Sequence, residues 1–381
     1  MSYLLPLVIF LLAAISAEIH AEMRGAWVAS VHNINFPSEQ GLSESAQKAE
    51  AIRLLDTAKA AGLDSILLQV RPEGDALYES RLEPWSRYLT GVQGRYPGYD
   101  PLDFFISQAK ARGLTVHAWI NPYRAAANAS HARASNHISR RLPQYTYKIG
   151  NVLWLDPGAP EVRRHINDVV RDLVTRYDIA GIHLDDYFYP YPSPKTGLPK
   201  FPDDKTHAAY KKTGGSLSKA DWRRHNVNTL IRELDHTIHS VRPKVKFGIS
   251  PFGIYTKGAP PDVNAGVDQY NELFSDPLAW MNEGWIDYLA PQLYWPDAGP
   301  QSFSSLLQWW RHPKVNPRGV PILPGIALDR LTSHGWERRE IERQLKIEKA
   351  TSPRKSGGFL LWNIDPLVKN TKGVLQAVRS R

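Results

Sequence analysis

The chain of 381 residues is long enough for one large α/β domain, and its 42% hydrophobic and 22% charged residues suit a globular protein with a large core. It contains no cysteine, which excludes disulfides, thiolate metal sites, cysteine nucleophiles and a lipid-modified N-terminal cysteine. The net charge of +9 attracts polyanions, but Lys and Arg are spread along the chain without a recognisable nucleic-acid motif, so we expect no nucleic-acid partner.

The chain begins with an apolar run at residues 4–17, which is short for a membrane span and ends in small residues suited to signal peptidase. This pattern predicts a secretory signal over residues 1–21 and a periplasmic or secreted protein, with no stable membrane insertion unless the segment stays uncleaved. No Lys or Arg precedes the run, which leaves an uncleaved anchor or a misassigned start codon as alternatives. For an exported protein, an anionic polymer of the cell wall or cell surface is the expected partner.

Strand and helix patterns alternate along the rest of the chain. The predicted strands cover 24–30, 65–70, 115–120, 181–186, 246–251, 286–295, 320–328 and 357–365. The predicted helices cover 46–61, 101–112, 160–177, 221–241, 277–283, 303–311, 337–350 and 370–380. Eight strand-then-helix units are the number that a TIM barrel needs, so the sequence predicts a single (β/α)8 barrel over residues 22–381.

Loop lengths support the same architecture. The helix-to-strand connections are short, whereas the strand-to-helix connections at 71–100, 121–159, 187–220 and 252–276 are much longer. Residues are therefore added on the face where barrel enzymes carry their active sites. The Pro, Gly and Lys-rich stretch 190–219 predicts a mobile active-site loop rather than a domain boundary.

The stretch GIHLDDYFY (181–189) is a short apolar strand that ends in two carboxylates and aromatic residues. Because strand side chains alternate, His183, Asp185 and Tyr187 share one face, and Asp185 is expected to point into the barrel mouth. Asp186 then braces Asp185 or binds substrate beside it. The alternative for each Asp is a role in capping the next helix or in pairing with an arginine.

Polar and aromatic residues gather at the predicted carboxyl ends of the other strands, including Trp27, Trp119, Ser250 and Trp362. Aromatic faces stack on pyranose rings, and amides and carboxylates bind hydroxyl groups, so this combination favours sugar recognition. The residues expected to bind substrate are Arg71, Asn121, Tyr123, Arg124, His183, Tyr187, Gln292, Tyr294, Trp295, Asn363 and Asp365.

Cleavage of a glycosidic bond needs one protonated and one ionised carboxyl group. We expect Asp185 to be the ionised group, held charged by Arg71 or Arg124. Glu73, on a loop just beyond a neighbouring strand end, is the expected proton donor.

Other assignments of these carboxyl groups stay open. A salt bridge of Glu73 to Arg71 or Arg81 is the structural alternative, and Asp365, Asp297 and Asp186 are further choices for the acid. The sequence lacks the motifs of serine hydrolases, zincins, phosphate-binding loops and dinucleotide-binding folds, so we expect no cofactor and no metal. A metal site at Asp185, Asp186 and His183 remains an alternative.

Several ordered motifs resemble the glycosyl-hydrolase-like family 10 of bacterial envelope proteins. They are RGAWVAS (24–30), QVRPEGDALY (69–78), PWSRYLTG (84–91), WINPYR (119–124), WLDPGAPEVR (154–163), GIHLDDYFYP (181–190) and QLYW (292–295). That family is assigned a TIM barrel and includes a division-site glycosidase that cuts peptidoglycan glycan strands stripped of their peptides. Its lipoprotein members carry a cysteine after the signal, which this chain lacks. The GIHLD strand is also similar to the GFRxD strand of α-amylase-like barrels, where the Asp is the nucleophile.

The residues and the resemblance together predict a glycoside hydrolase that cleaves an N-acetylated cell-wall polysaccharide, with peptidoglycan glycan as the expected substrate. Two-carboxylate acid/base chemistry is the expected mechanism. Cleavage assisted by the acetamido group of the substrate is a rival mechanism, and a non-catalytic, glycan-binding barrel of the envelope is a rival function.

Overall fold

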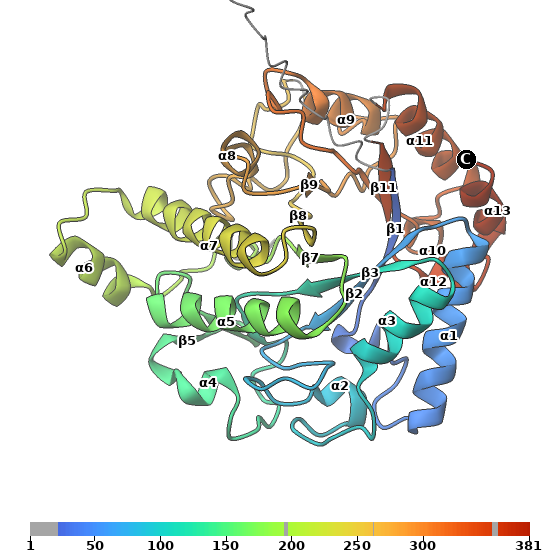
Figure 1. The fold of residues 1–381 in the computed structure, drawn as a ribbon. Helices are drawn as coiled ribbons and strands as arrows, with labels where there is room; N and C mark the ends of the chain where they lie inside the picture. Colours follow the sequence, from blue (N-terminus) through green and yellow to red (C-terminus); the bar gives the residue numbers. More distant parts are fainter. Residues whose placement is uncertain (1–21, 194–196, 262, 353–356) are drawn as a thin grey trace, which may run out of the picture.

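The computed structural model describes residues 22–193, 197–261, 263–352 and 357–381 (Figure 1). The predicted signal at residues 1–21 lies outside these residues. Among the helices of the described ranges, none has the length and apolar character needed to cross a membrane.

The described residues form an eight-stranded parallel sheet with the strand order β10-β11-β1-β2-β3-β7-β8-β9. Its strands are β1 (Met23–Val28), β2 (Ser65–Arg71), β3 (Thr115–Ile120), β7 (Gly181–Leu184), β8 (Lys246–Ile249), β9 (Tyr288–Leu289), β10 (Gly325–Ala327) and β11 (Gly358–Trp362). All eight predicted strands are confirmed, and the last three before β11 are shorter than predicted. The sheet curls, and Figure 1 shows the helices arranged around its outside.

Two isolated parallel bridges lie near the two ends of this strand order. Isolated parallel bridges connect Leu289 with Ile322 and Gln292 with Gly325. The amide of Leu289 donates to the Pro321 carbonyl at 2.9 Å, and the amide of Gly325 donates to the Pro291 carbonyl at 2.8 Å. The segments around β9 and before β10 are therefore neighbours.

The helices follow the strands as predicted. They include α1 (Glu44–Ala60), α3 (Pro101–Ala111), α5 (Pro160–Arg176), α7 (Lys219–Val241), α8 (Pro277–Glu283), α9 (Phe303–Arg311), α11 (Arg338–Thr351) and α13 (Val374–Arg379). Their starts are set by local chemistry: the Ser43 and Ser218 hydroxyls cap α1 and α7, and Pro occupies the first turn of α3, α5 and α8. The shorter elements are η1 (Val31–Asn33), α2 (Arg87–Thr90), α4 (Ile138–Arg141), η2 (Pro143–Tyr145), α10 (Arg330–Ser333), α12 (Asp365–Val368) and η3 (Thr371–Gly373).

Three of the long strand-to-helix connections contain structure that the sequence did not predict, and in 71–100 this is the short helix α2. Residues 121–159 carry an antiparallel sheet of β4 (Arg124–Ala126), β6 (Val152–Leu155) and β5 (Thr146–Ile149). The stretch 190–219, predicted as a mobile loop, contains the helix α6 (Asp204–Lys212). The buried Asp203 carboxylate precedes α6 and binds Arg223 of α7 at 2.7 Å, which ties this connection to the helical layer.

Side chains alternate between the two faces of the sheet. Trp27 and Leu67 belong to an inner cluster with Trp119, Tyr288 and Leu360, whereas their chain neighbours pack outward into the large core beneath the helices. This alternation is the pattern expected for strands with a filled interior on one side and helices on the other.

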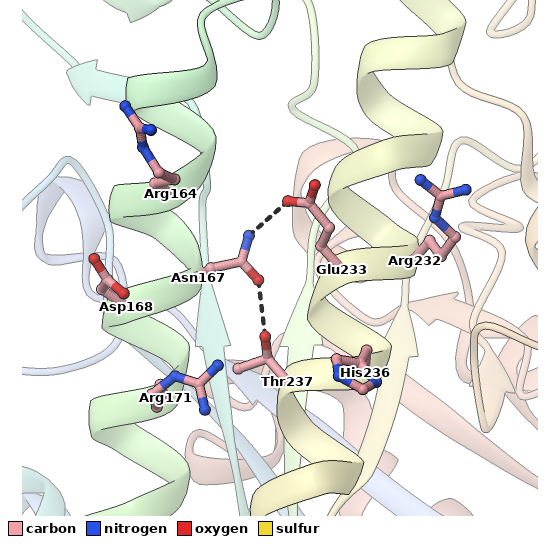
Figure 2. A pocket seen from close by; sticks show the side chains of 8 residues that line it. All are labelled: Arg164, Asn167, Asp168, Arg171, Arg232, Glu233, His236 and Thr237. Carbon is pink, nitrogen blue, oxygen red and sulfur yellow. Dashed lines mark hydrogen bonds between the residues drawn. The ribbon is translucent and has the colours of Figure 1, made fainter.

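Helices α5 and α7 pack side by side in the outer layer. The Asn167 amide donates to Glu233 at 3.0 Å and accepts from the Thr237 hydroxyl at 3.0 Å (Figure 2). A surface pocket of about 580 Å³ lies between these helices, and its lining contains arginines, acids and one histidine but no Trp, Tyr or Phe. It lacks the flat aromatic surfaces that sugar recognition requires.

Candidate active site

A smaller pocket, of about 200 Å³, lies at the carboxyl ends of the strands. Its lining combines carboxyl groups, an amide and aromatic rings: Trp27, Trp119, Asp185, Asp186, Tyr187, Tyr191, Ser250, Gln292, Tyr294 and Trp362. The structure therefore brings together five residues that were predicted as catalytic or substrate-binding from two separate sequence motifs, 181–190 and 292–295. Tyr191 was missed, although it continues the tyrosine-rich run that follows Asp186.

Asp185 follows directly after β7, and 8% of its surface is exposed. Three N–H groups of the described residues donate to its carboxylate: Asn121 Nδ2 at 3.2 Å, the Asp186 amide at 2.8 Å and Gln292 Nε2 at 3.5 Å. These three donors fix the orientation of the Asp185 carboxylate in the pocket.

Asp186 lies beside Asp185 in a different environment. It is 4% exposed, and burial together with the negative charge of Asp185 raises its pKa well above the usual range. The Tyr191 hydroxyl donates to the Asp186 carboxyl group, which opposes this shift only in part. A carboxyl group with a raised pKa beside a second carboxyl group allows the two to divide acid and base roles between them.

The described sequence matches the family model "Glycosyl hydrolase-like 10" over residues 22–338. The chain belongs to this family. It is 39% identical over 370 residues to "Glycosyl hydrolase YngK" of Bacillus subtilis, covering 94% of this chain and 71% of the relative. It is 37% identical over 327 residues to "Glycosyl hydrolase DigH" of Escherichia coli K12, covering 80% of this chain and 73% of the relative. Both the family and these relatives support a glycosidase.

Solved structures with a similar fold include a glycoside hydrolase domain and the catalytic domain of a β-amylase. The glycoside hydrolase domain of PgaB (BpsB) from Bordetella bronchiseptica has a TM-score of 0.61 at 14% identity, covering 94% of this chain and 98% of that chain. The catalytic domain of β-amylase from Paenibacillus polymyxa has a TM-score of 0.61 at 12% identity, covering 95% and 97%. At such low identity the similarity concerns the fold.

In this member of the glycosyl hydrolase-like 10 family, Asn121 and Arg124 link the pocket to the neighbouring loops. Asn121 Oδ1 accepts from Gln69 Nε2 at 2.6 Å and from Arg124 at 3.1 Å, which directs its Nδ2 toward Asp185. The Arg124 guanidinium lies 5.0 Å from the centre of the Tyr187 ring. Arg124 thus supports Asp185 through Asn121.

Glu73, the predicted proton donor, is not part of the described lining of the pocket around Asp185. It is 2% exposed and accepts a hydrogen bond from the Ala127 amide. Burial first and the nearby Asp75 second raise its pKa to about 7. Such a pKa suits a proton donor near neutral pH.

Arg71 was predicted to bind substrate, but its partners in the structure are groups of the protein. It is fully buried, and it forms a salt bridge of 2.6 Å with the fully buried Glu83. It also donates to the Asn121 carbonyl at 2.6 Å. Because these partners occupy the guanidinium, Arg71 supports the strand ends and does not pair with Glu73 or hold Asp185.

Two further residues predicted to bind substrate are fully buried outside the pocket lining. Tyr123 packs in the outer core, and its hydroxyl has no hydrogen-bond partner among the described residues. His183 points into the interior of the sheet, where it contacts Trp27, Ser250 and Tyr288. It therefore does not face a metal site with the two Asp side chains, and the described residues contain no cluster of three or more metal-binding side chains.

The remaining predicted residues hold neighbouring loops. Trp295 packs against Phe252 with ring centres 5.5 Å apart. Asn363 accepts from Asn35 at 3.0 Å and from the Asp365 amide at 3.0 Å, and the Asp365 carboxylate lies 4.0 Å from Lys369.

Asp297, another choice for the acid, accepts from the Ser304 amide at 2.9 Å and the Ser302 hydroxyl at 3.1 Å. It therefore supports the start of α9. Neither Asp297 nor Asp365 belongs to the described lining of the pocket around Asp185.

Proposed function

We propose that this protein is a glycoside hydrolase that cleaves an N-acetylated cell-wall polysaccharide, with peptidoglycan glycan strands as its substrate. The observation that carries the proposal is the pocket in which Asp185 and Asp186 meet Trp27, Trp119 and other aromatic rings. Sugar rings stack on such faces, and the two carboxyl groups supply acid/base chemistry. The resemblance to a family with an enzyme for denuded peptidoglycan points to the same substrate.

The proposal includes a closed (β/α)8 barrel and a location outside the cytoplasm. The bridges from Leu289 to Ile322 and from Gln292 to Gly325 support closure between β9 and β10. Closure would arrange the strand ends around one mouth. The apolar run at residues 4–17 supports export to the periplasm or the medium.

Two carboxyl groups that act from opposite sides of a glycosidic bond lie about 5–9.5 Å apart. Asp185 and Asp186 are consecutive residues that line one pocket, so we do not expect them to act from opposite sides of the bond. In one mechanism Asp185 is therefore the nucleophile or base, and Glu73 is the proton donor after a movement that brings it to the substrate.

The position of both Asp side chains in one pocket favours a second mechanism, in which the acetamido group of the substrate is the nucleophile. Its carbonyl oxygen attacks the anomeric carbon, Asp186 gives its proton to the leaving oxygen, and Asp185 accepts a hydrogen bond from the acetamido N–H. Water then attacks the anomeric carbon, and Asp186 takes back a proton. We favour this route because both carboxyl groups line one pocket.

Incubation with denuded glycan strands, intact sacculi and chemically N-deacetylated strands tests the proposal. New reducing ends are expected from denuded strands, and loss of cleavage on deacetylation is expected for the acetamido route. Cleavage of deacetylated strands would favour Glu73 as the donor. Binding without new ends in any sample would instead identify a non-catalytic, glycan-binding barrel.

A further inference from the structure

A chain of buried polar side chains crosses the interior of the sheet. The Tyr288 hydroxyl lies 3.1 Å from His117 Nδ1 and 3.0 Å from His183 Nδ1. On its other side, His183 Nε2 lies 2.9 Å from the Ser250 hydroxyl and accepts from Trp27 Nε1 at 3.2 Å. All five side chains are buried, so a polar group in this network that lost its hydrogen-bond partner would destabilise the fold.

Two glycines provide the space for the rings in this chain. A Cβ atom on Gly181 would lie 2.2 Å from His117 Nδ1, and one on Gly248 would lie 2.0 Å from the Tyr288 ring. Strands β7 and β8 thus carry glycine at the two positions where the neighbouring imidazole and phenol fill the interior. The two glycines therefore leave the space that the His117 and Tyr288 rings occupy.

Donor and acceptor chemistry gives every bond in the chain a direction. An indole N–H can only donate, so His183 Nε2 must accept from Trp27. Burial lowers the pKa of both histidines, for His117 to about 4, so both are neutral near neutral pH. The proton of His183 is then on Nδ1 and is donated to Tyr288, whose hydroxyl donates to His117 Nδ1.

This hydrogen-bonded network runs from the amino ends of the strands to their carboxyl ends. Trp27 and Ser250 line the pocket that contains Asp185. His117 and Tyr288 line a second pocket, of about 500 Å³, with Met23, Ser65 and Thr115 from the first residues of β1, β2 and β3. Residues near the amino ends of the strands are therefore hydrogen-bonded to the base of the sugar pocket.

We propose that Tyr288 and His117 are positioning residues of the sugar pocket: they hold His183 in the tautomer that keeps Trp27 and Ser250 in place. This inference rests on the proposed glycosidase function. If His183 carried its proton on Nε2, that N–H would face the Trp27 N–H, and the indole would lose its acceptor. The tautomer of a side chain that does not line the pocket thus decides where a sugar-stacking ring lies.

The first test measures the tautomer in the unmodified protein by ¹⁵N NMR of the histidine rings. The proposal requires a protonated Nδ1 and an unprotonated Nε2 on His183. The opposite tautomer would overturn the proposal without any variant having to fold.

The second test is Tyr288→Phe, which keeps the ring and removes the hydroxyl. We expect KM for denuded glycan to rise about tenfold, as for the loss of about one hydrogen-bonded contact, with kcat changed by less than about twofold. We also expect an altered His183 ¹⁵N signature. Tyr189→Phe is the matched control, because Tyr189 is buried and its hydroxyl has no partner among the described residues.

An unchanged KM in Tyr288→Phe, with an active wild-type enzyme, would overturn the positioning role and leave the glycosidase proposal intact. A wild-type protein without turnover on any glycan would overturn the glycosidase proposal, and the positioning role with it. Equal effects of Tyr288→Phe and Tyr189→Phe would show general destabilisation and would also contradict the inference.

Discussion

The buried Glu73 offers a sharp test of the electrostatics around the site, through the variant Glu73→Gln. Burial and Asp75 raise the pKa of Glu73 from 4.5 to about 7. Between these values the folded protein binds more protons than the unfolded chain, so the free energy of unfolding falls as pH rises from about 4.5 through about 7. The shift corresponds to about 3 kcal/mol, an upper limit because Asp75 shares it.

Glutamine keeps the carbonyl acceptor for the Ala127 amide and removes the charge. We therefore expect Glu73→Gln to match the wild type in stability near about pH 4.5 and to exceed it by up to about 3 kcal/mol near about pH 8. Urea unfolding at several pH values measures this difference directly. The exposed Glu39 provides the control Glu39→Gln, for which we expect a change within about 0.5 kcal/mol.

The reasoning would be refuted by a Glu73→Gln protein that is less stable than wild type by the same amount at every pH. That result would mean that Glu73 is ionised in the fold and is stabilised by the charge of Arg124. A loss of turnover in this variant without loss of glycan binding would separately favour Glu73 as the proton donor.

Two further predictions concern groups beside the pocket. Arg71→Met leaves the Glu83 carboxylate buried without its guanidinium partner and is expected to cost about 3–5 kcal/mol in urea unfolding; a loss below about 1 kcal/mol would contradict the structural role of the pair. Because the negative charge of Asp185 raises the pKa of Asp186, Asp185→Asn is expected to lower it, and carboxyl titration by NMR should show Asp186 ionising at lower pH in the variant. An unchanged Asp186 titration would show that the two carboxyl groups are not coupled.

Much of the fold follows from sequence periodicity. The helices predicted at 277–283 and 303–311 have these same bounds in the structure. Helix α8 starts with Pro277 and ends before Gly284, and the Ser302 hydroxyl caps the start of α9. Inside the insertion at 121–159, short strands such as β4 and β5 carry too little pattern to be recognised, and their pairing depends on contacts with β6.

The candidate site was likewise predictable from the sequence only in part. Alternation along the strand predicted that His183 and Asp185 share one face, because side-chain direction is a local property. Asp185 lines the pocket, whereas His183, which was predicted to bind substrate, contacts Tyr288 in the interior instead. The ion-pair partner of a charged side chain, by contrast, depends on how distant segments fold together. Arg71 pairs with Glu83, which lies in the loop twelve residues later. The contact of Tyr191 with Asp186 likewise depends on a turn that the sequence pattern does not define.

The most direct test of the account is the turnover of Asp185→Asn on denuded glycan strands, measured beside its binding of the same strands. Asparagine has nearly the same shape and lacks the negative charge, so we predict that kcat/KM falls by about 10²–10⁴ while the dissociation constant stays within about threefold of wild type. A folded Asp185→Asn protein that cleaves the strands at the wild-type rate would contradict the account.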